Sequence, residues 1–126
     1  MKLNLKAFTR EKHAKVVSGD FPVEEGSPAT AWPKVEQSIT ALLAARPNND
    51  FKIGRTNDLK RRDNGHQSDE LIEVYRTESL DEVMEMETIA IKAFSTWDGC
   101  QNGPEDSRGN SGPGDQSVYV AFWERT

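Results

Sequence analysis

The sequence predicts one α+β domain, with a small three-stranded antiparallel sheet flanked by helices. Two stretches, 70–77 and 117–123, show the period-two side-chain pattern of strands. A short apolar run at 51–55 supplies a third strand, and stretches with apolar residues at helical spacing lie before and after it. With 126 residues the chain can build one modest core but not two. We therefore expect one domain over 32–126, preceded by a partly ordered N-terminal arm over 1–31.

The first helix is expected over 33–46. Pro33 suits a first helical position, because its fixed φ matches the helix and its missing N–H would have no partner there. The apolar residues that follow recur at helix spacing: Val35, Ile39, Leu42 and Leu43. The polar segment 46–50, which contains Pro47, then ends the helix and leads into the first strand.

The chain is organised around the stretch 51–66. It begins as the strand 51–55, with a tight turn expected at Gly54. A basic helix over 57–63 follows. Its N-cap is one of three good capping residues: Thr56, Asn57 or Asp58. A strand that leads into a basic helix start directs backbone amides and cations to one point, which suits a phosphate group.

The second strand, 70–77, is followed by a capping box. The strand is expected to place Leu71, Glu73 and Tyr75 on one face, with Ile72 and Val74 on the other. Ser79 is the expected N-cap and Glu82 stands three residues later, which is the spacing of a capping box. We therefore expect a helix over 80–95.

A carboxylate lies in the middle of the apolar stripe of this helix. The stripe is made of five residues: Leu80, Val83, Met84, Ile91 and Phe94. Glu87 falls between them, and a buried carboxylate costs several kcal/mol unless it is paired or bound to a metal. Three interpretations remain: a functional carboxylate, a structural ion pair with an arginine, and a helix rotated so that Glu87 reaches its edge.

A long polar stretch and a last strand complete the chain. Five of the nine glycines lie between Asp98 and Gln116, and a loop of that length in a small domain is usually functional or disordered. Asn102 and Arg108 are its candidates for contact with a nucleic acid or a metal-bound water. The strand 117–123 then places Tyr119 on one of its faces.

Composition limits the compartment and the kind of metal site. The chain has no apolar run of the ~20 residues that span a bilayer, and it lacks the apolar core of a signal peptide. Its single cysteine cannot form an internal disulfide, so we expect a cytoplasmic protein without membrane contact. One cysteine and two histidines cannot build a zinc cage alone, so oxygen ligands must hold any metal.

The charges are unevenly distributed. The net charge is −5, which is unusual for a nucleic-acid-binding protein. Residues 52–66 nevertheless carry five Lys or Arg and two Asp, whereas residues 67–87 carry eight acids and one Arg. A basic patch beside an acidic segment fits a metal-assisted phosphodiesterase, and it also fits an ordinary solvated surface.

The stretch Phe-Lys-Ile-Gly-Arg-Thr-Asn-Asp-Leu-Lys-Arg-Arg, followed by His66, resembles the second signature block of the GIY-YIG nucleases. The resemblance is to the variants with Lys-Ile-Gly in place of Tyr-Ile-Gly, and Glu87 and Asn102 follow at fitting distances. It covers about 51–102. The first block, Gly-Ile-Tyr, is not recognisable. The strand 117–123 could take its place, with Tyr119 as the missing tyrosine.

The resemblance implies an endonuclease that hydrolyses phosphodiester bonds, with DNA as the expected substrate and one Mg²⁺ or Mn²⁺ as cofactor. It implies that Glu87 holds the metal and that Arg62 binds a phosphate oxygen. His66 would accept a proton from the nucleophile or phosphate, or form a hydrogen bond with it. Asn102 and Tyr119 complete the expected catalytic set. Four cations are expected to contact backbone phosphates: Lys52, Arg55, Lys60 and Arg61. A phage, a mobile element or a restriction system is the expected context.

Other functions fit the same residues. One is a catalytically reduced relative that binds nucleic acid or a protein partner without cleavage. Another is a small α+β domain whose charged residues only pair with each other. Accessibility of Glu87 separates these interpretations, because a metal ligand needs an open site and a structural ion pair does not. If the chain cuts both strands with one small site, it is expected to act as a homodimer.

Overall fold

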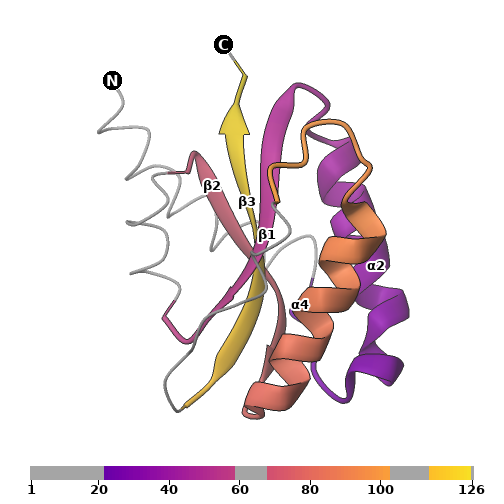
Figure 1. Cartoon of the computed structure of the whole chain (residues 1–126), viewed down its shortest axis with the longest axis vertical. Helices are drawn as coiled ribbons and strands as arrows, with labels where there is room; N and C mark the ends of the chain where they lie inside the picture. The colour runs from indigo at the N-terminus through magenta and orange to yellow at the C-terminus, as the bar shows by residue number, and fades with distance from the viewer. Residues whose placement is uncertain (1–21, 59–67, 103–113, 126) are drawn as a thin grey trace.

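The computed structural model describes residues 22–58, 68–102 and 114–125. Within these ranges the chain folds as a three-stranded antiparallel sheet with two helices, so the predicted α+β class is confirmed (Figure 1). The elements follow in the order α2 (Pro28–Ala44), β1 (Asn49–Thr56), β2 (Glu70–Thr77), α4 (Leu80–Phe94) and β3 (Gln116–Glu124). Most of the predicted helix over 57–63 lies outside the described residues.

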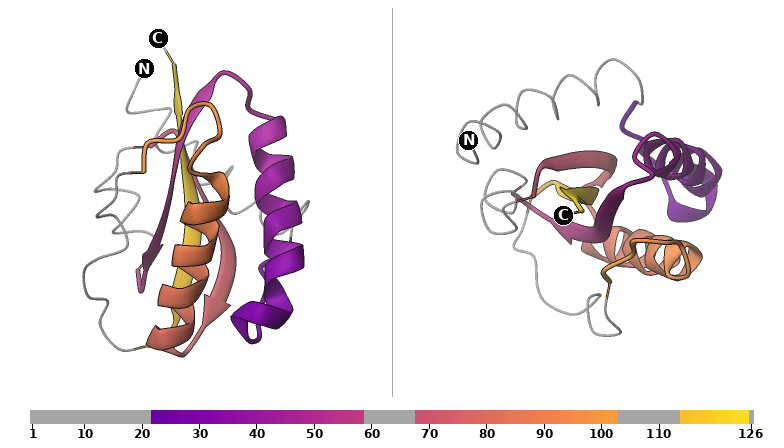
Figure 2. Two further views of the ribbon diagram at one scale, coloured as in Figure 1. Left: turned by 45° about the vertical axis from the view of Figure 1, so that its right-hand side comes forward. Right: turned by 90° about the horizontal axis from the view of Figure 1, so that it is seen from above.

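The last strand of the chain is the central strand of the sheet. The order is β1-β3-β2, and β3 pairs antiparallel with both neighbours. Both helices cover the same face of the sheet, as the two views in Figure 2 show. This arrangement gives the sheet one face that packs on the helices and a second face that points away from them.

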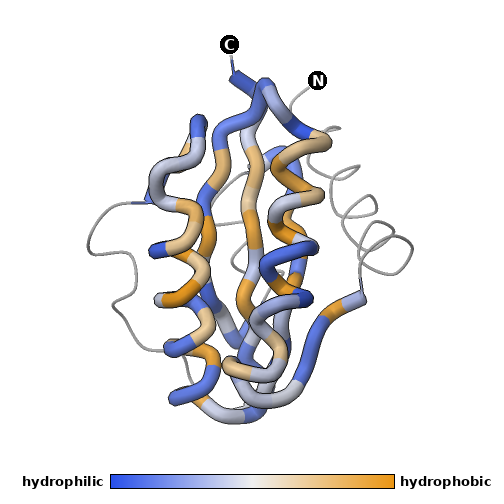
Figure 3. Tube along the Cα trace, turned by 90° about the vertical axis from the view of Figure 1, so that its right-hand side faces the viewer, coloured by the Kyte–Doolittle hydropathy of each residue, from blue (hydrophilic) through white to orange (hydrophobic). Residues whose placement is uncertain are grey.

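The main core lies between the helices and the sheet. Its buried residues come from α2 (Val35, Ile39, Leu42), from α4 (Val83, Met86, Phe94) and from all three strands, where Phe51, Ile72, Val118, Val120 and Phe122 point to the helices. Figure 3 looks onto this side and shows apolar stretches along the strands behind two helices of mixed polarity. The predicted alternation of β3 is confirmed, because Tyr119 and Ala121 belong to a separate cluster with Leu71 on the second face.

The helix α2 begins five residues before the predicted start at Pro33. Ser27 is its N-cap, and the Ser27 side chain accepts a hydrogen bond from the Thr30 backbone N–H at 3.4 Å. Pro28 occupies the first turn, so Ser27-Pro28 supplies the cap and the leading proline together. Pro33 then lies inside the helix, exposed to solvent. The prediction failed because two prolines suit a first turn and only one of them follows a capping residue.

The helix α4 begins as predicted, but its buried face is rotated. The side chain of Ser79 accepts a hydrogen bond from the Glu82 N–H at 3.2 Å, which confirms Ser79 as the N-cap. Leu80 and Met84 are each 38% exposed and do not belong to the buried stripe. The buried residues of the helix are Val83, Met86, Glu87, Ala90 and Phe94. Burial of Glu87 was therefore predicted, although the stripe around it was not.

Two local features of the strands differ from the predictions. Gly54 does not make a turn, because β1 continues through it to Thr56. The strand β2 has the predicted bounds, but it contains an irregularity between Glu73 and Tyr75, where the register with β3 shifts. A bulge adds one residue to a strand and reverses the faces of the side chains that follow it. Tyr75 consequently joins the main core instead of the face of Glu73.

The described end of the predicted N-terminal arm is attached to β2. Glu24 forms an isolated parallel bridge with Tyr75, through backbone hydrogen bonds from Glu24 N to Val74 O and from Arg76 N to Glu24 O. The Tyr75 hydroxyl also donates to the Gly26 carbonyl. These bonds fix the position from which α2 starts. Among the residues that the structure describes, no helix combines the length and apolarity that crossing a membrane requires.

An ion pair ties the end of α2 to the sheet. Arg46 donates from Nε and Nη2 to the two carboxylate oxygens of Glu70, at 2.7 and 2.9 Å, and its guanidinium lies 4.7 Å from the centre of the Phe122 ring. A bidentate pair of this kind is both strong and directional. It fixes α2 against β2 and β3 on the helix-covered face.

Candidate active site

The predicted site residues fall into two groups. Lys60, Arg61, Arg62, His66 and Arg108 lie outside the described residues. The remaining residues belong to the described part of the chain, and they occupy three different places: the helix-covered face (Arg55, Glu87), the second face of the sheet (Lys52, Tyr119) and the outer edge of β1 (Asn102).

Glu87 is held in a buried ion pair. The Arg55 Nε donates to Glu87 Oε1 at 3.1 Å, and only 2% of the Glu87 side chain is exposed. Of the interpretations left open by the sequence, an ion pair with an arginine is the one that the structure contains. Arg55 is also buried, since it follows Phe51 and Ile53 on the helix-covered face of β1. It faces α4 and pairs with Glu87, and its contact with backbone phosphates stays a prediction.

The described residues do not fit a divalent ion at Glu87 as they stand. Mg²⁺ needs oxygen ligands and keeps several waters, so its ligand must be accessible. Glu87 instead has a guanidinium on one of its oxygens and almost no exposed surface. Within the described ranges there is also no group of three or more His, Cys, Asp or Glu that could hold a metal ion.

Tyr119 lies against Gly54 of the Lys-Ile-Gly motif. The two residues are register partners on the neighbouring strands β3 and β1. A Cβ atom at position 54 would lie 2.6 Å from Cζ of Tyr119, so the tyrosine ring occupies the space that a side chain at this position would need. Only glycine allows this approach. The motif strand and the tyrosine are far apart in the sequence, and the central position of β3 brings them together.

The second face also carries Lys52. Because side chains alternate along a strand, Lys52 shares a face with Gly54, and its register partner Ala121 shares the face of Tyr119. Lys52 and Tyr119 are thus diagonal neighbours. Glu87, by contrast, is on the buried side of α4, which packs on one face of the sheet, whereas Tyr119 lies on the opposite face. The fold does not bring these two predicted residues together.

Asn102 acts on the backbone of β1. Its side-chain oxygen accepts from the Ile53 N–H at 2.9 Å, and its side-chain nitrogen donates to the Ile53 carbonyl at 2.8 Å. Gly99 and Gln101 bond the backbone of Phe51 in the same way, through Phe51 N to Gly99 O and Gln101 N to Phe51 O. The segment 99–102 therefore closes part of the outer edge of β1 in the manner of an additional strand. In this position Asn102 orients the Lys-Ile-Gly motif.

A polar network on the second face was missed by the sequence analysis. Glu73 is 5% exposed, and its carboxylate accepts from the Ser117 hydroxyl and from Arg76 at 3.0 Å (Nε) and 2.6 Å (Nη2). The hydrogen bonds from Arg76 to Glu73 are the main reason that the pKa of Arg76 is raised above its ordinary value. The signal in the sequence was a Glu on the same predicted strand face as Leu71, but the bulge that brings Arg76 to the face of Glu73 is not visible there.

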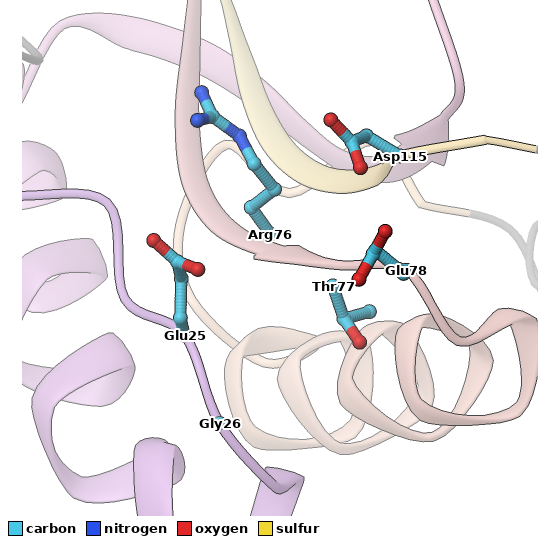
Figure 4. Close-up of a pocket in the computed structure, with 6 residues that line it drawn as sticks. All are labelled: Glu25, Gly26, Arg76, Thr77, Glu78 and Asp115. Atoms are coloured by element: carbon cyan, nitrogen blue, oxygen red, sulfur yellow. The ribbon is translucent and has the colours of Figure 1, made fainter.

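An open cavity of about 390 Å³ lies beside this network, at the end of β2 (Figure 4). It is lined by Glu25, Gly26, Arg76, Thr77, Glu78 and Asp115. Three carboxylates surround it, while the guanidinium of Arg76 is engaged by Glu73. A cavity with this charge repels a phosphate backbone, so it does not serve the predicted nucleic-acid contact.

Tyr75 does not compete with Tyr119 as the site tyrosine. It lies in the main core, and its hydroxyl donates to the Gly26 carbonyl. Burial, followed by the negative charge of Glu82, raises its pKa above the ordinary value for tyrosine. A tyrosine with a raised pKa is a weaker source of phenolate, and this one faces the helices. Tyr119 is the tyrosine adjacent to the motif.

The chain was compared with known proteins in three ways. No protein-family model matches it, and neither the curated proteins nor the solved structures contain a match. The resemblance to the GIY-YIG nucleases accordingly rests on the motif residues of this sequence.

The approach of Tyr119 to Gly54 can be tested by adding one methyl group. We expect Gly54→Ala to lower the free energy of unfolding by about 1–3 kcal/mol, since the new Cβ overlaps the ring and a buried ring cannot yield easily. In a Tyr119→Leu background the same substitution should cost much less. Urea denaturation of the four variants measures this coupling, and equal costs in both backgrounds would contradict the contact.

The role of Asn102 predicts a loss of stability localised to β1. Asn102→Ala removes the two hydrogen bonds to Ile53, so the free energy of unfolding should fall by about 1–3 kcal/mol and the Ile53 amide should exchange faster with D₂O. Gln101→Ala is the matched control, because its side chain is exposed and its backbone bond to Phe51 remains. A stable Asn102→Ala variant with unchanged exchange would leave a catalytic role as the better explanation.

Proposed function

We propose that this chain is a GIY-YIG-like endonuclease that hydrolyses phosphodiester bonds in nucleic acid, with DNA as the substrate. The observation that supports this proposal most is the position of Tyr119 on Gly54. The sequence has no recognisable Gly-Ile-Tyr block, and Tyr119 is the residue proposed in place of its tyrosine. The adjacency of Tyr119 and Gly54, which are far apart in the sequence, supports that assignment.

The proposed chemistry uses the second face of the sheet. Hydrolysis forms a bond between phosphorus and a water oxygen and breaks the bond to the leaving sugar oxygen, which takes up a proton. Lys52 would stabilise the negative charge that builds on the phosphoryl oxygens. The Tyr119 phenol would donate a hydrogen bond to the same group, and because Tyr119 is only 2% exposed this contact requires its surroundings to open. Arg62 and His66 complete the proposal, as a bidentate phosphate ligand and as the group that handles the proton.

A divalent cation is part of the proposal, with Glu87 as its ligand. Mg²⁺ or Mn²⁺ would supply Lewis-acid stabilisation of a phosphoryl group when bound. The resemblance gives Glu87 as the ligand, but its buried pair with Arg55 does not fit a divalent ion, and Glu87 lies on the face opposite Lys52 and Tyr119.

The second candidate function is binding of nucleic acid or a protein partner without cleavage, and the Arg55–Glu87 pair favours it. Removing one partner of a buried ion pair leaves an uncompensated charge at a cost of roughly 3–5 kcal/mol. A pair of this kind is a stable structural element rather than a vacant ligand. In this form Lys52 and the basic residues after β1 would still provide salt-dependent affinity for a backbone.

Two further parts of the proposal concern the state of the protein in the cell. A single cysteine fits a reducing compartment, so we place the protein in the cytoplasm. Cleavage of both strands of a duplex by one small site favours action as a homodimer.

The endonuclease is tested by relaxation of supercoiled plasmid with Mg²⁺ or Mn²⁺, with and without EDTA. We expect nicking by the native chain, its loss in EDTA, and a decrease of about 10²-fold or more in Tyr119→Phe, which loses only the hydroxyl. Glu87→Gln should also lose activity, and Glu85→Gln is its matched control because Glu85 is an exposed acid on the same helix. Circular dichroism of each variant verifies that it is folded.

The outcomes separate the two functions. If the folded native chain leaves the plasmid intact but binds a fluorescent DNA duplex with an affinity that falls with salt, the non-cleaving function is correct. Nicking that persists equally in Tyr119→Phe and Glu87→Gln contradicts the proposed site. Absence of both cleavage and binding contradicts the nucleic-acid function altogether.

A further inference from the structure

Three residues form a row across the second face of the sheet. Gly54 is the register partner of Tyr119 on one side, and Glu73 is its register partner on the other. Directly opposed residues of an antiparallel pair have Cβ atoms about 4.5–5.5 Å apart, so their side chains are neighbours. The tyrosine therefore stands between a position without a side chain and a position with a buried carboxylate.

The ring of Tyr119 leans toward β1. The absent side chain of Gly54 leaves a slot there, and the ring and hydroxyl fill it. Tyr119 is 2% exposed, so its ring is enclosed by its surroundings. The slot by itself does not prevent the ring from leaning the other way, toward β2. What stands on that side decides whether the ring keeps one orientation.

On the side of β2 stands the Glu73 network. The carboxylate is held by Arg76 at two nitrogens and by the hydroxyl of Ser117, which lies two residues before Tyr119 on the same strand. Charge-assisted and bidentate bonds of this type are short and directional, so they fix the position of the carboxylate. Glu73 is thus an immobilised neighbour of Tyr119.

The bulge in β2 makes this network possible. In a regular strand, residues three apart point to opposite faces. The extra residue between Glu73 and Tyr75 removes that opposition, so that Arg76 can reach Glu73 on the second face. Bulges re-aim side chains and are over-represented next to active sites. Here the bulge brings a counter-ion to the carboxylate beside the site tyrosine.

We propose that Glu73 is a positioning residue, which closes the side of Tyr119 toward β2 and thereby holds the phenol over Gly54. The effect of this inference on cleavage rests on the proposed function. The phenol can donate a hydrogen bond to the phosphoryl group only if the ring is held in a suitable position. The placement itself depends only on the packing of the second face. Glu73 acts through Tyr119 and does not itself contact the substrate.

The matched control is Glu70. Both Glu70 and Glu73 lie on β2, are buried, and bind an arginine through both carboxylate oxygens. Glu70 pairs with Phe122 and faces the helices, whereas Glu73 pairs with Tyr119. Glu73→Gln and Glu70→Gln therefore remove comparable interactions on opposite faces of one strand.

The placement is tested by NMR on protein with ¹³C-labelled tyrosine rings. The chain has two tyrosines, so two ring signals are expected, and Tyr75→Phe assigns them. We expect Glu73→Gln to shift or broaden the Tyr119 signal, while Glu70→Gln leaves it in place. A Tyr119 signal that is unchanged by Glu73→Gln, or that responds equally to both substitutions, overturns the inference.

The effect on cleavage is tested by a double-mutant cycle. We expect Glu73→Gln to lower kcat by about 10- to 100-fold with little change in KM, since a small displacement of a catalytic group is costly. In a Tyr119→Phe background it should have no further effect, whereas additive losses would overturn the positioning role. If the native chain does not cut although the Tyr119 signal responds as expected, the proposed cleavage fails and the placement of Tyr119 by Glu73 stands.

Discussion

The sheet depends on the pairing of its last strand with two earlier ones. Because the order is β1-β3-β2, β1 and β2 do not pair with each other, and every described pairing between these strands passes through β3. Each of these contacts is long-range in the sequence, so the entropy of closing a long loop has to be compensated before the sheet gains its packing energy. The alternating apolar side chains of β3 provide that energy, since they fill the main core on one face and meet Leu71 on the other.

The same constraint determines what the two faces of the sheet can do. The helix-covered face is closed by α2 and α4. Of the described ion pairs on this face, Arg55–Glu87 is buried and Arg46–Glu70 is partly buried. The second face carries the motif glycine, Tyr119 and the Glu73 network. The polar groups of both faces are buried: Tyr119 is 2% exposed and Glu73 5%, and Glu87 is 2% exposed on the sheet-facing side of α4. The second face differs in that it places a tyrosine on the motif glycine.

Several features could be predicted from the sequence because they depend on short-range patterns. The bounds of β2 follow from its period of two, and the start of α4 follows from the Ser79 cap. Burial of Glu87 followed from its helical spacing, but its partner Arg55 did not, since an ion pair across elements depends on tertiary packing. The rotated face of α4 shows the same limit, because Leu80 and Met84 fit the spacing and are still exposed.

Features that depend on strand order or on a single extra residue were not predictable. The bulge in β2 moves Tyr75 into the core and Arg76 onto Glu73, and no local pattern marks it. Asn102 was predicted as a site residue from its offset in the sequence after Glu87. Its bonds to the Ile53 backbone arise only when the segment 99–102 pairs with β1. From the sequence, the strand 117–123 was expected only as a replacement for the missing Gly-Ile-Tyr strand, and the approach of Tyr119 to Gly54 was not predicted.

The central claim is that the second face of the sheet, around Lys52, Gly54 and Tyr119, meets the nucleic acid. The most direct test is titration of ¹⁵N-labelled protein with a short DNA duplex in EDTA, followed by amide chemical shifts. We expect the largest changes at these residues and their neighbours on β3, with the acidic cavity near Glu78 unaffected. Changes confined to the helices or to the cavity, or none at all at low salt, would contradict it.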